Sequence, residues 1–286
     1  MKLWSGRFNK DTNALVDELN ASIDFDSRMF REDIRGSIAH ASMLGAQGII
    51  DKEESEKIIA CLNEILSDIE AGRLEFNRDA EDIHMFVEAE LTRRIGDAGK
   101  RVHTARSRND QVALDFRLYL KREAIEIKGQ ILELMKVILK LAEGGIDVIM
   151  PAYTHLQRAQ PTTFAHYMMA YANMLLRDVT RLEDCLERMD ECPLGSGALT
   201  STTYPIDRLR VARELGFARV TQNSLDGVSD RDFAIEFMGC ISILMMHLSR
   251  LSEEIIMWCS WEFKFIELDD AFATGSPLCR KRKTPT

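Results

Sequence analysis

Two polar segments, each placed just before an apolar-periodic stretch, carry residue types that could bind an anion or move a proton. The first runs from His103 to Gln111 and contains two arginines, hydroxyl groups and side-chain amides. Guanidinium groups and the free N–H groups of a helix start both bind carboxylates or phosphates. The same pattern is also typical of a capping segment with solvated arginines, so spacing alone leaves both interpretations open.

The second segment, from Tyr153 to Pro161, contains His155. A histidine titrates near neutral pH, so His155 is a candidate proton carrier, although a hydrogen-bonded loop histidine fits equally well. A third segment ends in Gly275-Ser276, where the glycine would let a hydroxyl approach a ligand closely. Taken alone, this third pattern is a weak signal.

The sequence gives little support for a metal site or a nucleotide-binding site. Asp82 and His84 lie two residues apart, but no second cluster at ligand spacing accompanies them, so we predict a hydrogen-bonded pair and no metal. The chain has no glycine-rich dinucleotide motif, no phosphate-loop lysine and no GxSxG elbow, which argues against a nucleotide enzyme or a serine hydrolase.

The elements that must position these segments are long helices. Apolar residues recur every three or four positions in three stretches, and each stretch is long enough to need packing partners along its whole length. Their broad apolar faces also suggest packing between subunits. Pro161 is expected in the first turn of the second helix. The stretches run over 112–142, 164–189 and 233–258.

Shorter helical patterns fill the first 110 residues, including one that begins at Asp51 and stops at Gly72. Alternating runs are too short for more than a marginal sheet. We therefore predict an all-α fold in which a smaller helical N-terminal domain precedes a long-helix central bundle. The expected ranges are 1–110 for the first domain, 111–275 for the incomplete bundle and 276–286 for a basic tail.

Composition excludes several classes of protein. The 286 residues carry a formal net charge of −9, which disfavours nucleic-acid binding. Charges interrupt the apolar runs before the roughly 18 residues that a membrane span needs, so no membrane association is expected. The N-terminus has no apolar signal region and the six cysteines are scattered, which favours a cytoplasmic protein with reduced thiols.

Together these segments resemble the argininosuccinate lyase family of the fumarase/aspartase superfamily. The likeness extends over nearly all of residues 1–276, and Ala105 stands where the family usually has glycine. The matching segments, in the family's order, are Leu3 to Phe8, Asn20 to Ser22, Glu81 to His84, His103 to Gln111, Tyr153 to Thr162, Gly195 to Leu199 and Asn223 to Asp226.

The resemblance implies reversible cleavage of argininosuccinate to arginine and fumarate without a metal or organic cofactor. It also implies a homotetramer whose active sites combine residues of different subunits. By this likeness His155 is a catalytic proton-transfer residue and Ser276 falls on the catalytic serine. The positions that fall on substrate-binding or pocket-lining residues are Ser22, Asn109, Thr154, Arg108 and His84.

The chemistry of such an elimination fits these residue types. Removing a proton next to a carboxylate requires fixed donors that stabilise the resulting anion, and a second group must protonate the departing nitrogen. We hypothesise that Ser276 abstracts the proton and that His155 is its acid/base partner. The sequence leaves the assignment of acid and base open.

The chain departs from the family after Ser276. Arg282 replaces the lysine of the family's catalytic loop and Thr284 replaces its asparagine. Family members continue well beyond this point, so the tail is expected to be aberrant and the bundle incomplete. Two alternatives follow: a non-catalytic helical fragment or structural protein of the same scaffold, and a sister lyase acting on another substrate that yields fumarate.

Overall fold

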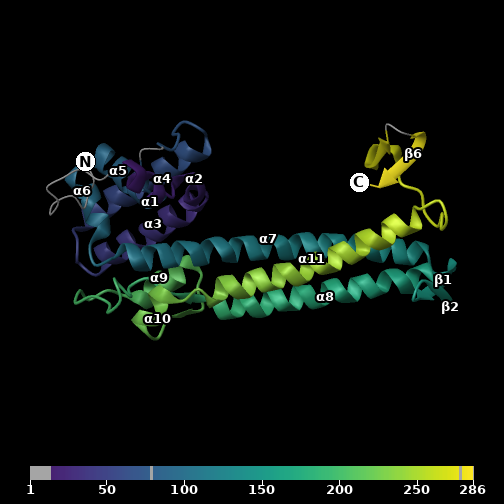
Figure 1. The fold of residues 1–286 in the computed structure, drawn as a ribbon. Coiled ribbons are helices and arrows are strands. Elements are labelled where there is room, and N and C mark those ends of the chain that lie inside the picture. Colours follow the sequence, from purple (N-terminus) through teal and green to yellow (C-terminus); the bar gives the residue numbers. More distant parts are fainter. Residues whose placement is uncertain (1–13, 78–79, 277–278, 286) are drawn as a thin grey trace. The chain divides into compact units, whose positions relative to one another are not determined.

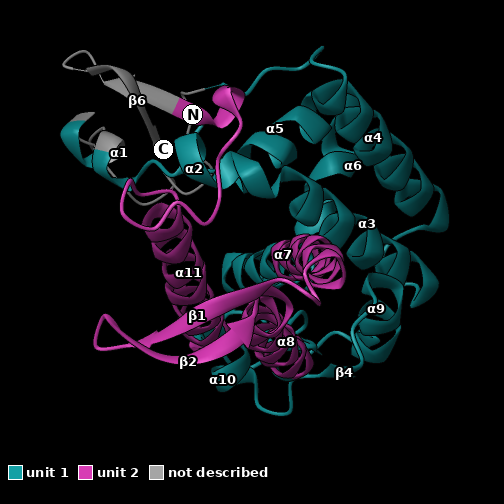
Figure 2. Ribbon diagram, turned by 90° about the vertical axis from the view of Figure 1, so that its right-hand side faces the viewer, with its two compact units in different colours: residues 1–122, 188–231 teal, residues 123–187, 232–286 magenta. Residues whose placement is uncertain are grey.

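The computed structural model describes residues 14–77, 80–276 and 279–285. Helices form most of this part of the chain, and its strands pair into three two-stranded sheets (Figure 1). The predicted all-α fold is therefore confirmed. Two compact units are distinguished in Figure 2: residues up to Arg122 with Arg188–Arg231, and Glu123–Glu187 with the chain from Asp232 onward.

The first unit combines short helices with the beginning of the long helix α7 (Arg108–Gly144). Its other helices are α1 (Ala14–Asn20), α2 (Ile23–Asp26), α3 (Phe30–Ala46), α4 (Lys52–Glu70), α5 (Ile83–Ile95), α6 (Asp97–Lys100), α9 (Arg208–Leu215) and α10 (Ser224–Ser229), with the 3₁₀ turns η2 (Ser27–Met29) and η3 (Arg101–His103). A short parallel pair joins β3 (Glu191–Cys192) to β4 (Arg219–Val220).

Helix α4 illustrates how the sequence sets a local structure. It begins after Asp51 and ends just before Gly72, whose positive φ of 68° turns the chain, as predicted. Its inward face packs on α3, where Ser55 donates a hydrogen bond of 2.8 Å to the Ala41 carbonyl. Gly45 permits this approach, because a Cβ there would lie 2.6 Å from Ser55.

One apolar core holds the first unit together, and the later segment 188–231 contributes to it. Cys192, Leu194 and Phe217 are buried in the same cluster as the side chains of α3, α4 and α5. Because residues 188–231 pack into this core, the segment 193–201 lies beside the beginning of α7, where the candidate site is found. The largest fully buried side chains of this core are Ile34, Met43, Leu44, Ile58, Leu62, Ile65, Ile83, Leu91 and Leu114.

The second unit contains the predicted long-helix bundle. The later part of α7 runs alongside α8 (Phe164–Met189) and α11 (Asp232–Trp258) (Figure 1). The polar contacts between α8 and α11 include two short ones: His247 Nδ1 lies 2.6 Å from Asp178 Oδ2, and the Tyr167 hydroxyl donates to Glu254 Oε1 at 2.7 Å. The unit also contains β1 (Ile149–Thr154), β2 (Gln157–Thr163), η4 (Asp270–Phe272), β5 (Ala273–Ser276) and β6 (Cys279–Pro285).

The segment around Pro161 differs from its prediction. Pro161 lies in β2, opposite Pro151 of β1, and α8 begins only at Phe164. The reason is the turn at His155 and Leu156, whose φ values of 54° and 58° fold the chain back on itself as a hairpin. The expected helix start at Pro161 is therefore wrong.

Helix α11 (Asp232–Trp258) bears on the expectation of no membrane span. By length and hydropathy alone this helix could cross a membrane: its most apolar window has a mean hydropathy of 1.4, and 28% of that window is buried. Charges interrupt the apolar run at Glu236 and Arg250, as predicted, and the uncharged stretch between them is shorter than a membrane span needs. Several apolar side chains of the long helices are exposed in the single chain: Ile125, Leu132, Val137, Leu139, Met169, Leu176, Ile235, Met238, Met245, Met246 and Ile256.

Candidate functional site

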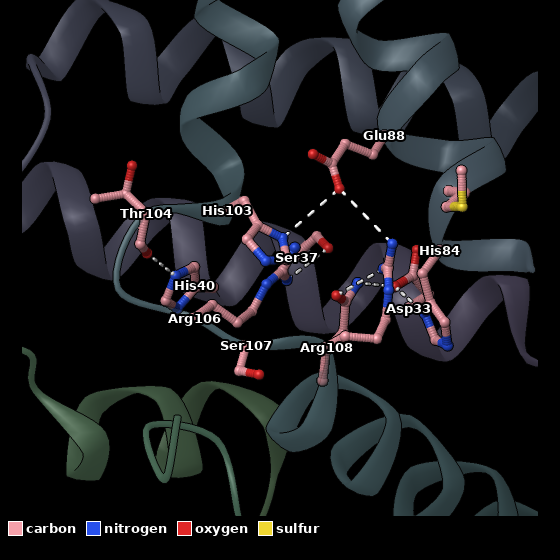
Figure 3. Close-up of polar contacts among 12 residues, drawn as sticks. Asp33, Ser37, His40, His84, Glu88, His103, Thr104, Arg106, Ser107 and Arg108 are labelled. Atoms are coloured by element: carbon pink, nitrogen blue, oxygen red, sulfur yellow. Dashed lines mark hydrogen bonds and ion pairs between the residues drawn. The ribbon is translucent and has the colours of Figure 1, made fainter. Parts of the chain in front are cut away.

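The segment between η3 and α7 is a tight turn that is held by hydrogen bonds to side chains of α3. Ala105 adopts a left-handed conformation with φ of 58°. The buried guanidinium of Arg106 donates to Ser37 Oγ at 3.0 Å, and His40 Nε2 lies 2.8 Å from the Thr104 carbonyl oxygen (Figure 3). Burial, with a smaller contribution from the charge of Arg106, lowers the pKa of His40 to about 3. A neutral His40 ring therefore donates its Nε2–H to that carbonyl.

Asp110 ties this turn to the segment that follows β3. Its buried carboxylate accepts hydrogen bonds from the backbone N–H groups of Ser107 (2.9 Å), Gly195 (3.0 Å) and Gly197 (2.8 Å). The Asn109 amide adds a bond of 2.8 Å to the Ala198 carbonyl. Two segments about 90 residues apart are thus held together at the first turn of α7.

A cluster of buried charged groups lies beneath the turn. Asp33 comes from α3, His84 from α5 and Asp115 from α7, and each is at most 2% exposed. His84 Nδ1 lies 2.9 Å from Asp33 Oδ1 and 3.2 Å from Asp115 Oδ2. Arg106 adds a second buried positive charge that interacts with both carboxylates. Two acidic groups therefore face two basic groups.

The protonation of this cluster follows from its contacts. Burial alone would lower the pKa of His84, but Asp33 and Asp115 outweigh it and raise that pKa to about 10. Burial would raise the pKa of Asp33, yet His84, Arg106 and Gln111 lower it below its ordinary value. Burial raises the pKa of Asp115, partly offset by His84. We therefore interpret His84 as a buried imidazolium.

The same three groups are of kinds that can hold a metal ion, with ligand atoms within 4.8 Å of one another. Asp33 and Asp115 lie far from His84 along the chain, so the spacing of residues in the sequence gives no sign of this cluster. However, Nδ1 of His84 faces both carboxylates at ion-pair distance, and a protonated nitrogen has no lone pair to offer a metal. Ion pairing therefore accounts for the cluster without a metal ion.

Arg108, predicted from the sequence to contact the substrate, lies at the edge of this cluster and is about 29% exposed. Its Nη1 donates to Gln111 Oε1 at 3.0 Å, and its Nε lies 3.6 Å from Asp82 Oδ2. Its Nη2 lies 3.9 Å from Glu88 Oε2 (Figure 3). Since a guanidinium has five N–H donors, donors remain for an anionic ligand. His103 also faces Glu88, at 3.6 Å.

Ser22 belongs to the same unit through the segment that carries Asp82 and His84. Its hydroxyl donates to Asp26 Oδ2 at 2.5 Å, and its backbone N–H donates to the Glu81 carbonyl at 2.7 Å. Asp82 caps α5 by accepting the Met85 N–H at 2.6 Å. The described structure therefore places Ser22, His84, Arg108 and Asn109 in one unit, with the His84 side chain buried below the surface rather than exposed to a ligand.

The other predicted residues belong to the second unit. Thr154 and His155 lie exposed at the tip of the β1–β2 hairpin. Ser276 ends β5, where its backbone pairs with Cys279, and its side chain lies outside the described residues. The matching segment Leu3 to Phe8 also lies outside them. The roles of Thr154, His155 and Ser276 remain predictions.

A family model described as a lyase matches residues 6–286. The chain belongs to this lyase family. Among curated proteins, it is 63% identical over 285 residues to an argininosuccinate lyase of Ruminiclostridium cellulolyticum and 60% identical to one of Acetivibrio thermocellus. Both matches cover 100% of this chain and 62% of the relative, so the chain spans about three fifths of their length. The resemblance drawn from the sequence motifs is confirmed.

Solved structures of other lyases share the fold of this lyase chain. An EDDS lyase in complex with formate matches with a TM-score of 0.83 and 30% identity, over 94% of this chain and 53% of its own. A fumarate lyase of Brucella melitensis matches with a TM-score of 0.76 at 15% identity, over 98% of this chain and 65% of its own, a likeness of fold alone. The long-helix architecture is thus that of known lyases.

The turn at Ala105 leads to a stability prediction. A left-handed conformation costs a non-glycine residue about 1–2 kcal/mol. Glycine avoids this cost, but it also increases the conformational entropy of the unfolded chain, which offsets part of the gain in stability. We expect Ala105→Gly to raise the free energy of unfolding by about 0.5–1 kcal/mol, measured by urea denaturation. The control is Ala60→Gly on the exposed side of α4, where glycine should lower it by about 1 kcal/mol. A loss of stability in Ala105→Gly would contradict the strain argument.

The His84 cluster predicts a pH dependence. Because the pKa of His84 is about 10 in the folded chain and about 6.5 when unfolded, its stabilisation is complete below pH 6.5 and is lost as pH rises towards 10. His84→Gln should cost about 3–5 kcal/mol at pH 7, because it leaves two buried carboxylates with Arg106 as their remaining buried positive partner, and the deficit should shrink by pH 10. Urea titrations at several pH values measure both, with exposed His166→Gln as the control. A deficit that stays constant over this range would contradict the imidazolium.

Proposed function

We propose that the protein represented by this chain catalyses the reversible elimination of argininosuccinate to arginine and fumarate. The observation that carries the proposal is the near-60% identity of the whole chain to curated argininosuccinate lyases. The geometry at the start of α7 supports it, because an arginine with spare donors and a helix N-terminus suit a dicarboxylate.

In this proposal the first unit binds the acid groups of the substrate. Arg108 and Asn109 stand in the first turn of α7, and Ser22 is bonded to the adjoining segment at Glu81. His84 is buried beneath this surface as a cation, next to the residues that would contact the substrate. Fixed donors of this kind stabilise the anion that forms when a proton leaves the carbon next to a carboxylate.

Proton transfer is assigned to residues of the second unit. Ser276 would abstract the proton and His155 would act as its acid/base partner, with Thr154 binding substrate. No metal or organic cofactor is part of this proposal. The exposed position of His155 at a hairpin tip suits a group that completes the site of another subunit.

A homotetramer is the assembly we propose. Apolar side chains on α7, α8 and α11 are exposed in the single chain, and helices of further copies would cover them. We place the protein in the cytoplasm and in arginine biosynthesis, as a soluble enzyme acting on a small molecule and not on a nucleic acid or a membrane.

The activity is tested by following fumarate through its ultraviolet absorbance. We expect absorbance to rise when argininosuccinate is added, and not with aspartate, malate, adenylosuccinate or EDDS. A rise with one of the other substrates alone would identify a sister lyase. No rise with any substrate at high protein concentration would leave the chain as a non-catalytic scaffold. The protein should be assayed both as this 286-residue chain and as a longer form that matches the relatives over their full length.

The role of His155 is tested by His155→Asn. A proton-transfer group contributes about 10²-fold or more, so kcat should fall by at least that factor. The control is His166→Asn, an exposed histidine of the neighbouring helix α8, which should leave kcat within about twofold, the size of an ordinary surface effect. An unchanged rate in His155→Asn would remove His155 from the mechanism.

A further inference from the structure

We propose that Gln111 is a positioning residue that holds the Arg108 guanidinium by coupling it to the buried Asp33–His84–Asp115 cluster. The Gln111 side chain is 3% exposed and therefore sits between the buried cluster and the partly exposed arginine. The coupling itself is a property of the folded chain. Its consequence for substrate rests on the function proposed above, in which Arg108 binds a carboxylate.

Both ends of the Gln111 amide are engaged. Its Nε2 donates to Asp33 Oδ1 at 2.5 Å, and its Oε1 accepts from Arg108 Nη1 at 3.0 Å. Arg108 and Gln111 lie three residues apart in the first turn of α7, so their side chains share one face of the helix. The amide thus forms a continuous hydrogen-bonded path from the cluster to the guanidinium.

The cluster determines which way the amide points. An ionised Asp33 can only accept hydrogen bonds, so it selects the NH₂ end of Gln111 and leaves the carbonyl oxygen to face Arg108. The reversed amide would place its donors against a guanidinium that can only donate. His84, with Nδ1 2.9 Å from Asp33 Oδ1, keeps that carboxylate ionised and in place. The buried imidazolium therefore acts on Arg108 through two intermediates.

Arg108 depends on this contact more than on its other neighbours. Asp82 and Glu88 lie 3.6 Å and 3.9 Å from its nitrogens, distances at which charges attract without setting an orientation. Among the contacts of the described residues, the bond to Gln111 is the one with hydrogen-bond geometry. Removing it should leave the guanidinium near its acidic neighbours but free to rotate.

The first measurement needs no substrate. In protein labelled with ¹⁵N at arginine, with the Arg108 signal assigned by Arg108→Lys, Gln111→Met should raise the hydrogen-exchange rate of the Arg108 guanidinium about tenfold, as expected for losing one hydrogen bond to a charged group. Gln130→Met, an exposed change on the same helix, should leave that rate unaltered. Gln111→Asn, too short to bridge both partners, should repeat the effect if Gln111→Met fails to fold. An unaltered exchange rate in a folded variant overturns the coupling.

The second measurement separates positioning from general damage to the fold. If Gln111 acts through Arg108, Gln111→Met should raise KM for argininosuccinate about tenfold with little change in kcat, and should add nothing in an Arg108→Met background. An equal rise in KM in both backgrounds overturns the positioning role. If the unmodified enzyme does not turn over argininosuccinate, the proposed function fails, while the exchange measurement still decides the coupling.

Discussion

The interaction on which the first unit depends is the sharing of one buried imidazolium between two carboxylates. His84 of α5 stands between Asp33 of α3 and Asp115 of α7, with ion-pair distances of 2.9 and 3.2 Å. Charges removed from water cost several kcal/mol each unless they are paired, and here each needs a partner on another helix. The three helices must therefore pack in the one register that brings Asp33, His84 and Asp115 together. A shift of one helical turn in any of them would leave a buried charge alone.

This constraint extends to the turn above the cluster. The side chain of Arg106 interacts with the same two carboxylates. At the other end of the turn, the Asp110 carboxylate accepts hydrogen bonds from the backbone N–H groups of Gly195 and Gly197. Gly197 fits because a Cβ there would lie 2.6 Å from the Ser201 carbonyl oxygen. Anchors on both sides leave the turn few alternative conformations. Arg108 and Asn109 are thus positioned by buried residues, although they themselves reach the surface.

The sequence predicts much of this architecture because its signals are local. Apolar spacing locates the long helices to within a few residues, and Asp51 and Gly72 bound α4 correctly. The polar segment from His103 to Gln111 is predicted to precede a long helix, and it leads into α7; the left-handed backbone at Ala105 is found only in the structure. These features depend on residues within a few positions of one another.

Features that depend on distant partners escape such an analysis. Asp33 and Asp115 each look like an ordinary polar residue within a helix, and only the fold brings them to His84, 51 and 31 residues away. The hairpin at Thr154 is a different case, because its turn is local. His155-Leu156 is not a glycine- or asparagine-rich turn, so the sequence predicts a helix start at Pro161 instead. Pairing across the strands outweighs that local preference.

The long helices of the second unit combine specific polar contacts with uncovered apolar surface. His247 of α11 is buried against Asp178 of α8, and such a pair is stabilising only when both helices pack in the register that joins them. Tyr167 and Glu254 fix a second point along the same pair of helices. Ile235, Met238 and Met245 of α11 remain exposed, because one neighbour cannot cover a helix that is apolar over so much of its circumference. The polar contacts therefore specify the pairing of helices within the chain, whereas the exposed rows favour association with further helices.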